Sequence, residues 1–200
     1  MEVNRFVLGS FATNTYLLIN NDECLLIDPA SKADKLFPLL EDKKLLAVLL
    51  THGHFDHIKA CDGLYEKYKM PIYLNKKDLE LTKDNSQGRV FGLLNVPTIK
   101  SPILDLKEGK MEIGSFKFEV IFTPGHTKGS VCFLFDDFIF TGDTLFKMSA
   151  GRTDLKGGDS SELKASLRIL KNLDYNLVVY PGHDETSTML EEINNNPYLM

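Results

Sequence analysis

The histidines of this chain gather in motifs that could bind a metal ion. There are five in 200 residues, and three of them lie with an aspartate in one stretch, His52-Gly53-His54-Phe55-Asp56-His57. A mixture of imidazole nitrogens and carboxylate oxygens suits zinc, iron or manganese, whereas calcium prefers oxygen alone. An isolated buried histidine is usually a satisfied polar group. So many ligand-competent side chains this close together instead predict a metal site.

The two other histidines and a further aspartate each follow a glycine in a short motif. These motifs are Thr123-Pro124-Gly125-His126, Gly142-Asp143-Thr144 and Pro181-Gly182-His183. Each one alone would be more typical of a tight turn than of a ligand. Beside the first cluster, however, they offer the only histidines left to complete an open site, so we treat all three as ligand motifs.

The candidate metal ligands are therefore His52, His54, Asp56, His57, His126, Asp143 and His183. A single four-coordinate ion would leave some of them without a role, whereas two divalent ions that share Asp143 would use them all and leave room for water. Water held between two cations is readily deprotonated, and the ions also polarise a carbonyl and stabilise its oxyanion. We expect two ions, with zinc favoured and iron or manganese as alternatives.

Predicted strands lead directly into the ligand motifs and would hold these residues in place. Predicted strands at residues 45–50, 116–122, 138–140 and 177–180 each end just before a ligand motif. Loops at strand ends can converge along one edge of a layered structure while the core stays dry. The uninterrupted apolar run at 45–50 is typical of a strand covered on both faces. Asp28, which closes another apolar segment, could orient a ligand or simply end a strand.

The remaining pattern suggests two similar halves. We expect a hairpin turn at 20–22 and Ser31 as the N-cap of a helix that includes Leu36 and Leu40. Further strands are expected at 3–8, 15–19, 24–27 and 72–74 in the first half and at 103–106, 111–113 and 131–135 in the second, and helices at 57–69 and 186–195. The capping-box pattern Asp159-Ser160-Ser161-Glu162 is expected to open a third helix, with Leu163, Leu167 and Leu170 on one face. We infer an α+β four-layer sandwich of two mixed sheets with helices outside, although periodicity alone indicates only α/β or α+β. Residues 75–100 could cover a site or form a surface loop, with a short helix at 78–81.

Composition limits the function classes. The net charge of −5 and the lack of a basic stripe argue against nucleic-acid binding, and Lys76-Lys77 is more typical of a solvated face. Three cysteines at no motif spacing indicate buried, reduced thiols and a reducing compartment. The N-terminus lacks a signal-peptide pattern, and no apolar run approaches the ~20 residues of a membrane span. We expect a soluble, cytoplasmic protein without a membrane partner. The sequence does not predict its oligomeric state.

These motifs resemble the metallo-β-lactamase superfamily, whose pattern His-x-His-x-Asp-His stands here at His52 to His57. The similarity continues in order through Leu26-Ile27-Asp28-Pro29, Thr123-Pro124-Gly125-His126, Gly142-Asp143-Thr144 and Pro181-Gly182-His183. Within the superfamily the chain most resembles the glyoxalase II group, the hydroxyacylglutathione hydrolases. The resemblance implies an αββα sandwich in which His52, His54 and His126 hold metal one. Metal two would be held by Asp56, His57 and His183, with Asp143 bridging.

Other branches of the superfamily fit less well. β-Lactamases commonly use a cysteine ligand or lack the bridging aspartate, the nucleic-acid-cleaving branch carries a large inserted domain, and flavodiiron proteins need a flavin domain. The chain also departs from glyoxalase II, because it lacks the helical C-terminal extension that helps hold glutathione. Gly151-Arg152-Thr153-Asp154 stands where that group has a glutathione-contacting segment, and Arg152 could bind a carboxylate. We therefore expect one domain over residues 1–200, of the short glyoxalase-II-like kind.

The resulting hypothesis is hydrolysis of a small-molecule thioester such as S-lactoylglutathione by a metal-bridging hydroxide that Asp56 orients. A thiol leaves with a pKa near ~8.5, so no strong general acid is needed. Another small ester or lactone is an alternative substrate. The segment 151–154 also resembles the persulfide dioxygenases, in which His52, His126 and Asp143 would hold one iron. A metal-binding regulatory module is disfavoured because no ligand is missing.

Overall fold

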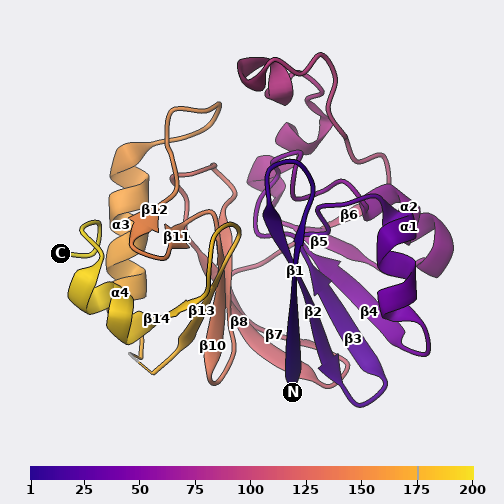
Figure 1. Cartoon of the computed structure of the whole chain (residues 1–200), viewed down its shortest axis with the longest axis horizontal. Coiled ribbons are helices and arrows are strands. Elements are labelled where there is room, and N and C mark those ends of the chain that lie inside the picture. Colours follow the sequence, from indigo (N-terminus) through magenta and orange to yellow (C-terminus); the bar gives the residue numbers. More distant parts are fainter. Residues whose placement is uncertain (175) are drawn as a thin grey trace.

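The computed structural model describes residues 1–174 and 176–200 and contains two six-stranded mixed sheets that face each other (Figure 1). The first sheet has the strand order β1-β2-β3-β4-β5-β6, antiparallel from β1 to β3 and parallel from β3 to β6. Its strands are β1 (Glu2–Leu8), β2 (Thr13–Asn20), β3 (Glu23–Ile27), β4 (Lys44–Leu49), β5 (Ile72–Leu74) and β6 (Ile103–Asp105).

The second sheet comes from the later part of the chain and has the order β14-β13-β10-β9-β8-β7, in which only β10 and β13 run parallel. Its strands are β7 (Gly109–Ile113), β8 (Phe116–Phe122), β9 (Val131–Leu134), β10 (Phe138–Gly142), β13 (Val178–Pro181) and β14 (Ser187–Thr188). A separate small hairpin pairs β11 (Leu145–Phe146) with β12 (Ser149–Ala150).

Helices cover the outer face of each sheet, which gives the predicted αββα sandwich (Figure 1). The first sheet carries α1 (Ala33–Leu36), the 3-10 helix η1 (Phe37–Leu40) and α2 (Cys61–Tyr68), while the second carries α3 (Ser160–Lys171) and α4 (Met189–Asn195). Strand β4 shows why the layers form. Its Ala47 and Leu49 pack between the sheets, whereas Val48 and the following Leu50 pack under the outer helices.

The first two predicted helices begin or end elsewhere than expected. Ser31 is not an N-cap, because α1 begins after Lys32 and continues only as the 3-10 turn that contains Pro38. Proline has no backbone N–H to continue an α-helix, so the α-helical part is a single turn. The helix expected from residue 57 begins at Cys61, because the preceding residues form turns in which the His57 N–H bonds to the His54 carbonyl and the Cys61 N–H to the Ile58 carbonyl, three residues back.

The C-terminal helix also begins later than residue 186. Ser187 and Thr188 first pair with β13 as β14, and the Thr188 side chain then forms a capping box with Glu191 at the start of α4. The N-cap predicted for α3 is confirmed, since Asp159 accepts hydrogen bonds from the N–H groups of Ser161 and Glu162. Local side-chain chemistry therefore sets both helix starts on the second sheet.

Residues 103–106 were expected in the second half but belong to the first sheet, where β6 pairs in parallel with β5. A parallel pair needs a long crossover, and residues 75–102 supply it. The crossover contains three 3-10 helices, η2 (Lys76–Asp78), η3 (Leu81–Lys83) and η4 (Gln87–Phe91), so the helix expected at 78–81 falls between two of them. This segment rises beyond one edge of the two sheets (Figure 1).

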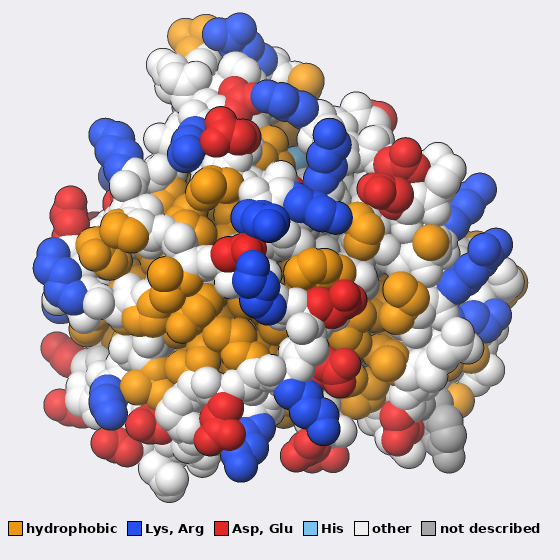
Figure 2. All heavy atoms as spheres, turned by 180° about the vertical axis from the view of Figure 1, so that it is seen from behind, with side chains coloured by type: hydrophobic (Ala, Val, Ile, Leu, Met, Phe, Trp, Pro, Cys, Tyr) orange, Lys and Arg blue, Asp and Glu red, His pale blue; other side chains and the backbone are white. Residues whose placement is uncertain are grey.

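The outer surface is mixed in character. Figure 2 shows hydrophobic side chains across the middle of one face, with acidic and basic side chains interspersed around them. Cys24, Cys61 and Cys132 are free and buried, as predicted. Among the described residues, no helix combines the length and the apolarity that a bilayer crossing requires.

Candidate metal centre

The ligand motifs meet at one edge of the two sheets. The loop with His52, His54, Asp56 and His57 follows β4 of the first sheet. The loops with His126, Asp143 and His183 follow β8, β10 and β13 of the second. Each predicted strand therefore delivers its motif to the same place, and all seven candidate side chains are brought together.

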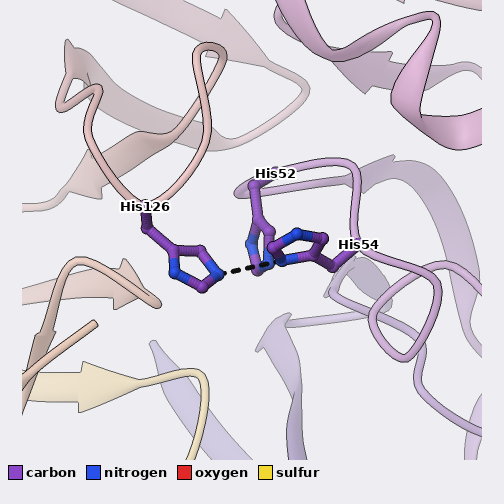
Figure 3. Close-up of side chains that lie close together, drawn as sticks. All are labelled: His52, His54 and His126. Carbon is purple, nitrogen blue, oxygen red and sulfur yellow. Dashed lines mark hydrogen bonds between the residues drawn. The ribbon is translucent and has the colours of Figure 1, made fainter. Parts of the chain in front are cut away.

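Three histidines form a first group. The ligand nitrogens of His52, His54 and His126 all lie within 4.8 Å of one another. His52 and His54 come from one loop and His126 approaches from the facing loop, with His54 Nδ1 2.9 Å from His126 Nε2 (Figure 3). Nitrogens that converge in this way from two loops can share one cation.

Asp56, His57 and His183 form a second group, whose ligand atoms also lie within 4.8 Å of one another. Asp56 Oδ2 is 3.4 Å from His57 Nε2 and 3.4 Å from His183 Nε2. The two imidazole nitrogens are 3.3 Å apart. This group has the donor types of a second divalent-ion site, two imidazoles and a carboxylate.

Asp143 lies between the two groups. Its Oδ2 is 3.4 Å from His126 Nε2 of the first group and 3.4 Å from His183 Nε2 of the second. The same oxygen is 4.0 Å from His52 Nε2, and Oδ1 is 3.5 Å from His57 Nε2. One carboxylate therefore reaches both groups, as a bridging ligand must.

Hydrogen bonds aim most of the imidazoles at the centre. His57 Nδ1 donates to Asp28 Oδ2 at 2.9 Å, His126 Nδ1 to the Arg152 carbonyl at 2.8 Å, and His183 Nδ1 to the Phe11 carbonyl at 3.1 Å. His52 Nδ1 lies 3.0 Å from Thr51 Oγ1, whose own proton goes to Asp28. Each of these contacts fixes the tautomer that leaves Nε2 free for a metal.

Electrostatics differ between the groups. Burial by itself lowers the pKa of His57, but the carboxylates of Asp56, Asp143 and Asp28 outweigh it and raise that pKa to about 9. The same competition raises the pKa of His183 to about 11, through Asp143 and Asp56. These imidazoles hold protons at neutral pH that a metal ion would displace.

Two histidines of the first group, His52 and His54, are neutral before any metal binds, because their pKa values are lowered. Burial and the nearby His126 lower the pKa of His54 to about 3, and burial together with His57 holds the pKa of His52 well below its usual range. Burial opposes ionisation of Asp143, yet the surrounding imidazoles keep its pKa well below the ordinary value. Neutral imidazole and ionised carboxylate are the forms that bind metal.

The donor set fits divalent metal ions. His52 Nε2 and Asp143 Oδ1 are buried and have no hydrogen-bond partner among the described residues. Buried polar atoms are almost always partnered, so two orphaned atoms that point into one cluster of ligands indicate a missing cation. Nitrogen and carboxylate donors without thiolates suit zinc, iron or manganese.

A cleft of about 620 Å³ opens beside the centre. The crossover expected as either a cover or a surface loop lines it through Leu81, Asp84, Gln87, Val90 and Phe91. The Arg152 side chain also lines it, but its guanidinium is bound to the Asp154 carboxylate through two 2.6 Å hydrogen bonds.

The sequence analysis missed several supporting groups of this site. Thr51, the carbonyls of Phe11 and Arg152, and the Asp78 carboxylate belong to no ligand motif. The glycines of the motifs were the available signal, because a glycine between ligands can mark the close approach of another group.

Comparison with known proteins identifies the family. The family model described as the metallo-beta-lactamase superfamily matches residues 8–183. The chain is 37% identical to the probable metallo-hydrolase YqgX of Bacillus subtilis, over all of this chain and 98% of the relative. It is 32% identical to the hydroxyacylglutathione hydrolase GloC of Haemophilus influenzae, with the same coverage.

Solved structures agree. The BLEG-1 B3 metallo-beta-lactamase superposes with a TM-score of 0.91 at 37% identity, over the full length of both chains. TTHA1623 in a di-iron-bound form gives 0.90 at 38% identity, over 98% of this chain and 100% of that one. ETHE1 from Myxococcus xanthus gives 0.80 at 29%, over 98% and 84%. With this match and this histidine and aspartate cluster, the chain belongs to the metallo-beta-lactamase superfamily.

Proposed function

We propose that this protein is a thioester hydrolase with two divalent metal ions, of the hydroxyacylglutathione hydrolase kind. The position of Asp143 carries the proposal, since its carboxylate reaches His126 of the first group and His183 of the second at 3.4 Å each. A bridging carboxylate is what separates a binuclear hydrolytic centre from two independent sites. The identity with GloC supports the thioester as the substrate class.

His52, His54 and His126 would hold one ion, and Asp56, His57 and His183 the other. When bound, two such ions lower the pKa of a water molecule and polarise the carbonyl that it attacks. Zinc is the expected metal. Iron is a real alternative, because the similar TTHA1623 was solved in a di-iron form.

Asp56 is positioned to orient the attacking water. Its carboxylate is held by Thr13 Oγ1 at 2.8 Å and lines the cleft. Burial opposes its ionisation, but His57 and His183 hold its pKa at about 2, so it stays charged and accepts hydrogen bonds at any physiological pH. In the reaction, the water oxygen attacks the acyl carbon and the carbon–sulfur bond breaks. The thiol leaves without a strong acid, because its own pKa is near ~8.5.

The cleft is suited to a substrate with an apolar portion. Phe11 packs edge-on against both Phe55 and Phe91, with ring centroids 5.2 and 5.1 Å away, and the three rings form one wall. The basic side chains of the cleft, Arg152 and Lys156, are paired with Asp154 and Asp84. A carboxylate on the thiol carrier would therefore compete with Asp154 for Arg152.

The proposal is tested with metal-loaded protein and a panel of S-lactoylglutathione, an acyl-coenzyme A, a lactone and a chromogenic β-lactam. We expect thiol release from at least one thioester and a loss of at least about 100-fold in Asp143→Asn. Asp136→Asn, in the exposed turn between β9 and β10, is the matched control. A protein that binds two ions and hydrolyses no thioester contradicts the proposal, and β-lactam turnover alone would assign the activity named for BLEG-1.

A second candidate, an iron-dependent persulfide dioxygenase, is favoured by the similarity to ETHE1. One iron would be held by His52, His126 and Asp143. Oxygen uptake with glutathione persulfide at one iron per chain would support it. Full turnover of a thioester in the zinc-loaded protein would exclude it as the main activity.

A further inference from the structure

One buried carboxylate outside the ligand set joins the loops that carry the first group. Asp78, at the end of η2, is only 1% exposed. Its Oδ2 accepts hydrogen bonds from the Gly53 N–H at 2.9 Å and from Thr127 Oγ1 at 2.6 Å, and its Oδ1 accepts one from the Gly129 N–H at 2.7 Å. Among the described residues it forms no ion pair.

All the donors lie beside the ligands of the first group. Gly53 separates His52 from His54, and Thr127 directly follows His126. The two loops come from different sheets, one after β4 and the other between β8 and β9. Asp78 therefore joins the two loops through its hydrogen bonds. Figure 3 shows the histidines that these loops carry, with His126 facing His52 and His54.

Asp78 packs closely against both ligand loops, at Gly53 in one and at Gly129 in the other. A Cβ added to Gly53 would lie 2.9 Å from the Asp78 carbonyl oxygen, and one added to Gly129 would lie 2.6 Å from Asp78 Cγ. Thr127 Oγ1 is fixed a second time by Ser130 Oγ at 2.7 Å. Glycine at both positions permits this close approach, which explains why glycine stands at 53, between two ligands, and at 129, three residues after His126.

We propose that Asp78 is a positioning residue that sets the spacing of His52, His54 and His126 for the first metal ion. This rests on the metal centre proposed above. Asp78 makes no hydrogen bond to the second group, and His57 is instead oriented by Asp28. Loss of the Asp78 contacts should therefore weaken one ion and spare the other.

Asp78→Asn tests this with little change of shape. One carboxylate oxygen becomes an NH2 group, which cannot accept a hydrogen bond. If Oδ1 is the oxygen replaced, the bond from the Gly129 N–H is lost; if Oδ2 is replaced, the bonds from the Gly53 N–H and Thr127 Oγ1 are lost. Metal-free full-length protein is titrated with Co2+ and followed by visible absorption. We expect one equivalent to bind about 10- to 100-fold more weakly, as for other groups that support metal ligands, and the other within about twofold of wild type. His126→Ala provides the reference spectrum for a disrupted first site.

Asp105→Asn is the matched control. Asp105 also accepts a backbone hydrogen bond, from the Lys76 N–H of the same turn at 2.9 Å, but it touches neither ligand loop. Both Co2+ equivalents should bind this control as they bind the wild type. A weakened first equivalent in the control would assign the effect to the turn and not to Asp78.

Thr127→Val serves as the test if Asp78→Asn does not fold, because it keeps the side-chain volume and removes only the two hydrogen bonds of Thr127 Oγ1, to Asp78 and to Ser130. We expect selective weakening of the first equivalent in Thr127→Val and its recovery in Thr127→Ser, which restores the hydroxyl. Unchanged Co2+ titrations in a folded Asp78→Asn, or in Thr127→Val, would overturn the proposal. A wild-type protein that binds only one ion would instead refute the binuclear centre itself.

Discussion

Gly182→Ala offers a sharp test of the geometry around Asp143. A Cβ added at Gly182 would lie well inside contact distance of Asp143 Oδ1 and 2.9 Å from His57 Cε1. The backbone at Gly182 is not in the left-handed region, so alanine carries no conformational penalty there. The substitution therefore acts through collisions, with the two ligand side chains and with the Gly142 backbone carbonyl carbon 3.0 Å away.

The loop cannot retreat from this collision. The Gly182 N–H bonds to the Gly142 carbonyl at 2.7 Å, and the Gly182 carbonyl accepts from the Asn14 N–H at 2.7 Å. Non-bonded carbon contacts need about 3.5 Å, so the Asp143 carboxylate must move by about 1 Å. A displacement of that size costs about 100-fold in turnover, and overpacking costs about 1–3 kcal/mol of stability.

The assay combines bound metal per chain, thioester turnover and thermal unfolding of metal-free protein. We expect Gly182→Ala to lose turnover by about 100-fold and to bind less than the wild-type amount of metal. Gly109→Ala is the control, because its φ of +104° strains alanine while no atom lies within 4 Å of the added carbon. Gly109→Ala should lower the unfolding temperature and should leave bound metal and thioester turnover unchanged. Wild-type metal content and turnover within twofold in Gly182→Ala would refute the assigned position of Asp143.

Three further outcomes follow from the same geometry. Chelation should lower the unfolding temperature, because ions that bind only the folded chain add about 2.7 kcal/mol at 100 times their Kd, and an unchanged transition would deny any structural metal. Binding of the second ion should release protons at neutral pH, because His57 and His183 have pKa values of about 9 and 11 in the metal-free protein. Its affinity should therefore rise with pH through about 9 and on to about 11, and calorimetry in buffers of different ionisation enthalpy measures the protons, with zero release as the contrary result. Arg152→Ala should raise KM for S-lactoylglutathione about 10-fold without changing kcat, and Asp154→Asn should lower it, whereas equal KM values would remove Arg152 from the substrate site.

The layers of the fold and the convergence of the ligands were predictable from the sequence. Strand periodicity and the unbroken apolar run before His52 depend on local burial, and β4 indeed buries both faces. Each ligand motif follows a strand directly, which indicated that the motifs could meet at one edge. The strands and the positions of the motifs follow from local sequence, whereas the pairing of the two sheets was implied by the resemblance to the superfamily.

Other features depend on long-range pairing and could not be predicted. No pattern in the local sequence indicates that β6 pairs with β5. The same pattern would equally allow β6 to pair with the strands that follow it in the chain. The turns before α2 include an Ala60 N–H that bonds to the Pro29 carbonyl, far away in the chain, and this contact could not be predicted from the local pattern. Asp78 stands in an unremarkable polar segment, and only the approach of two glycine-containing loops makes it part of the centre.

The assignment of seven ligands to two ions is tested most directly by anomalous diffraction from crystals of the metal-loaded protein. We predict two peaks that flank the Asp143 carboxylate. One should be bounded by His52, His54 and His126 and the other by Asp56, His57 and His183. A single peak in fully loaded crystals, or two peaks of which neither contacts Asp143, would contradict it.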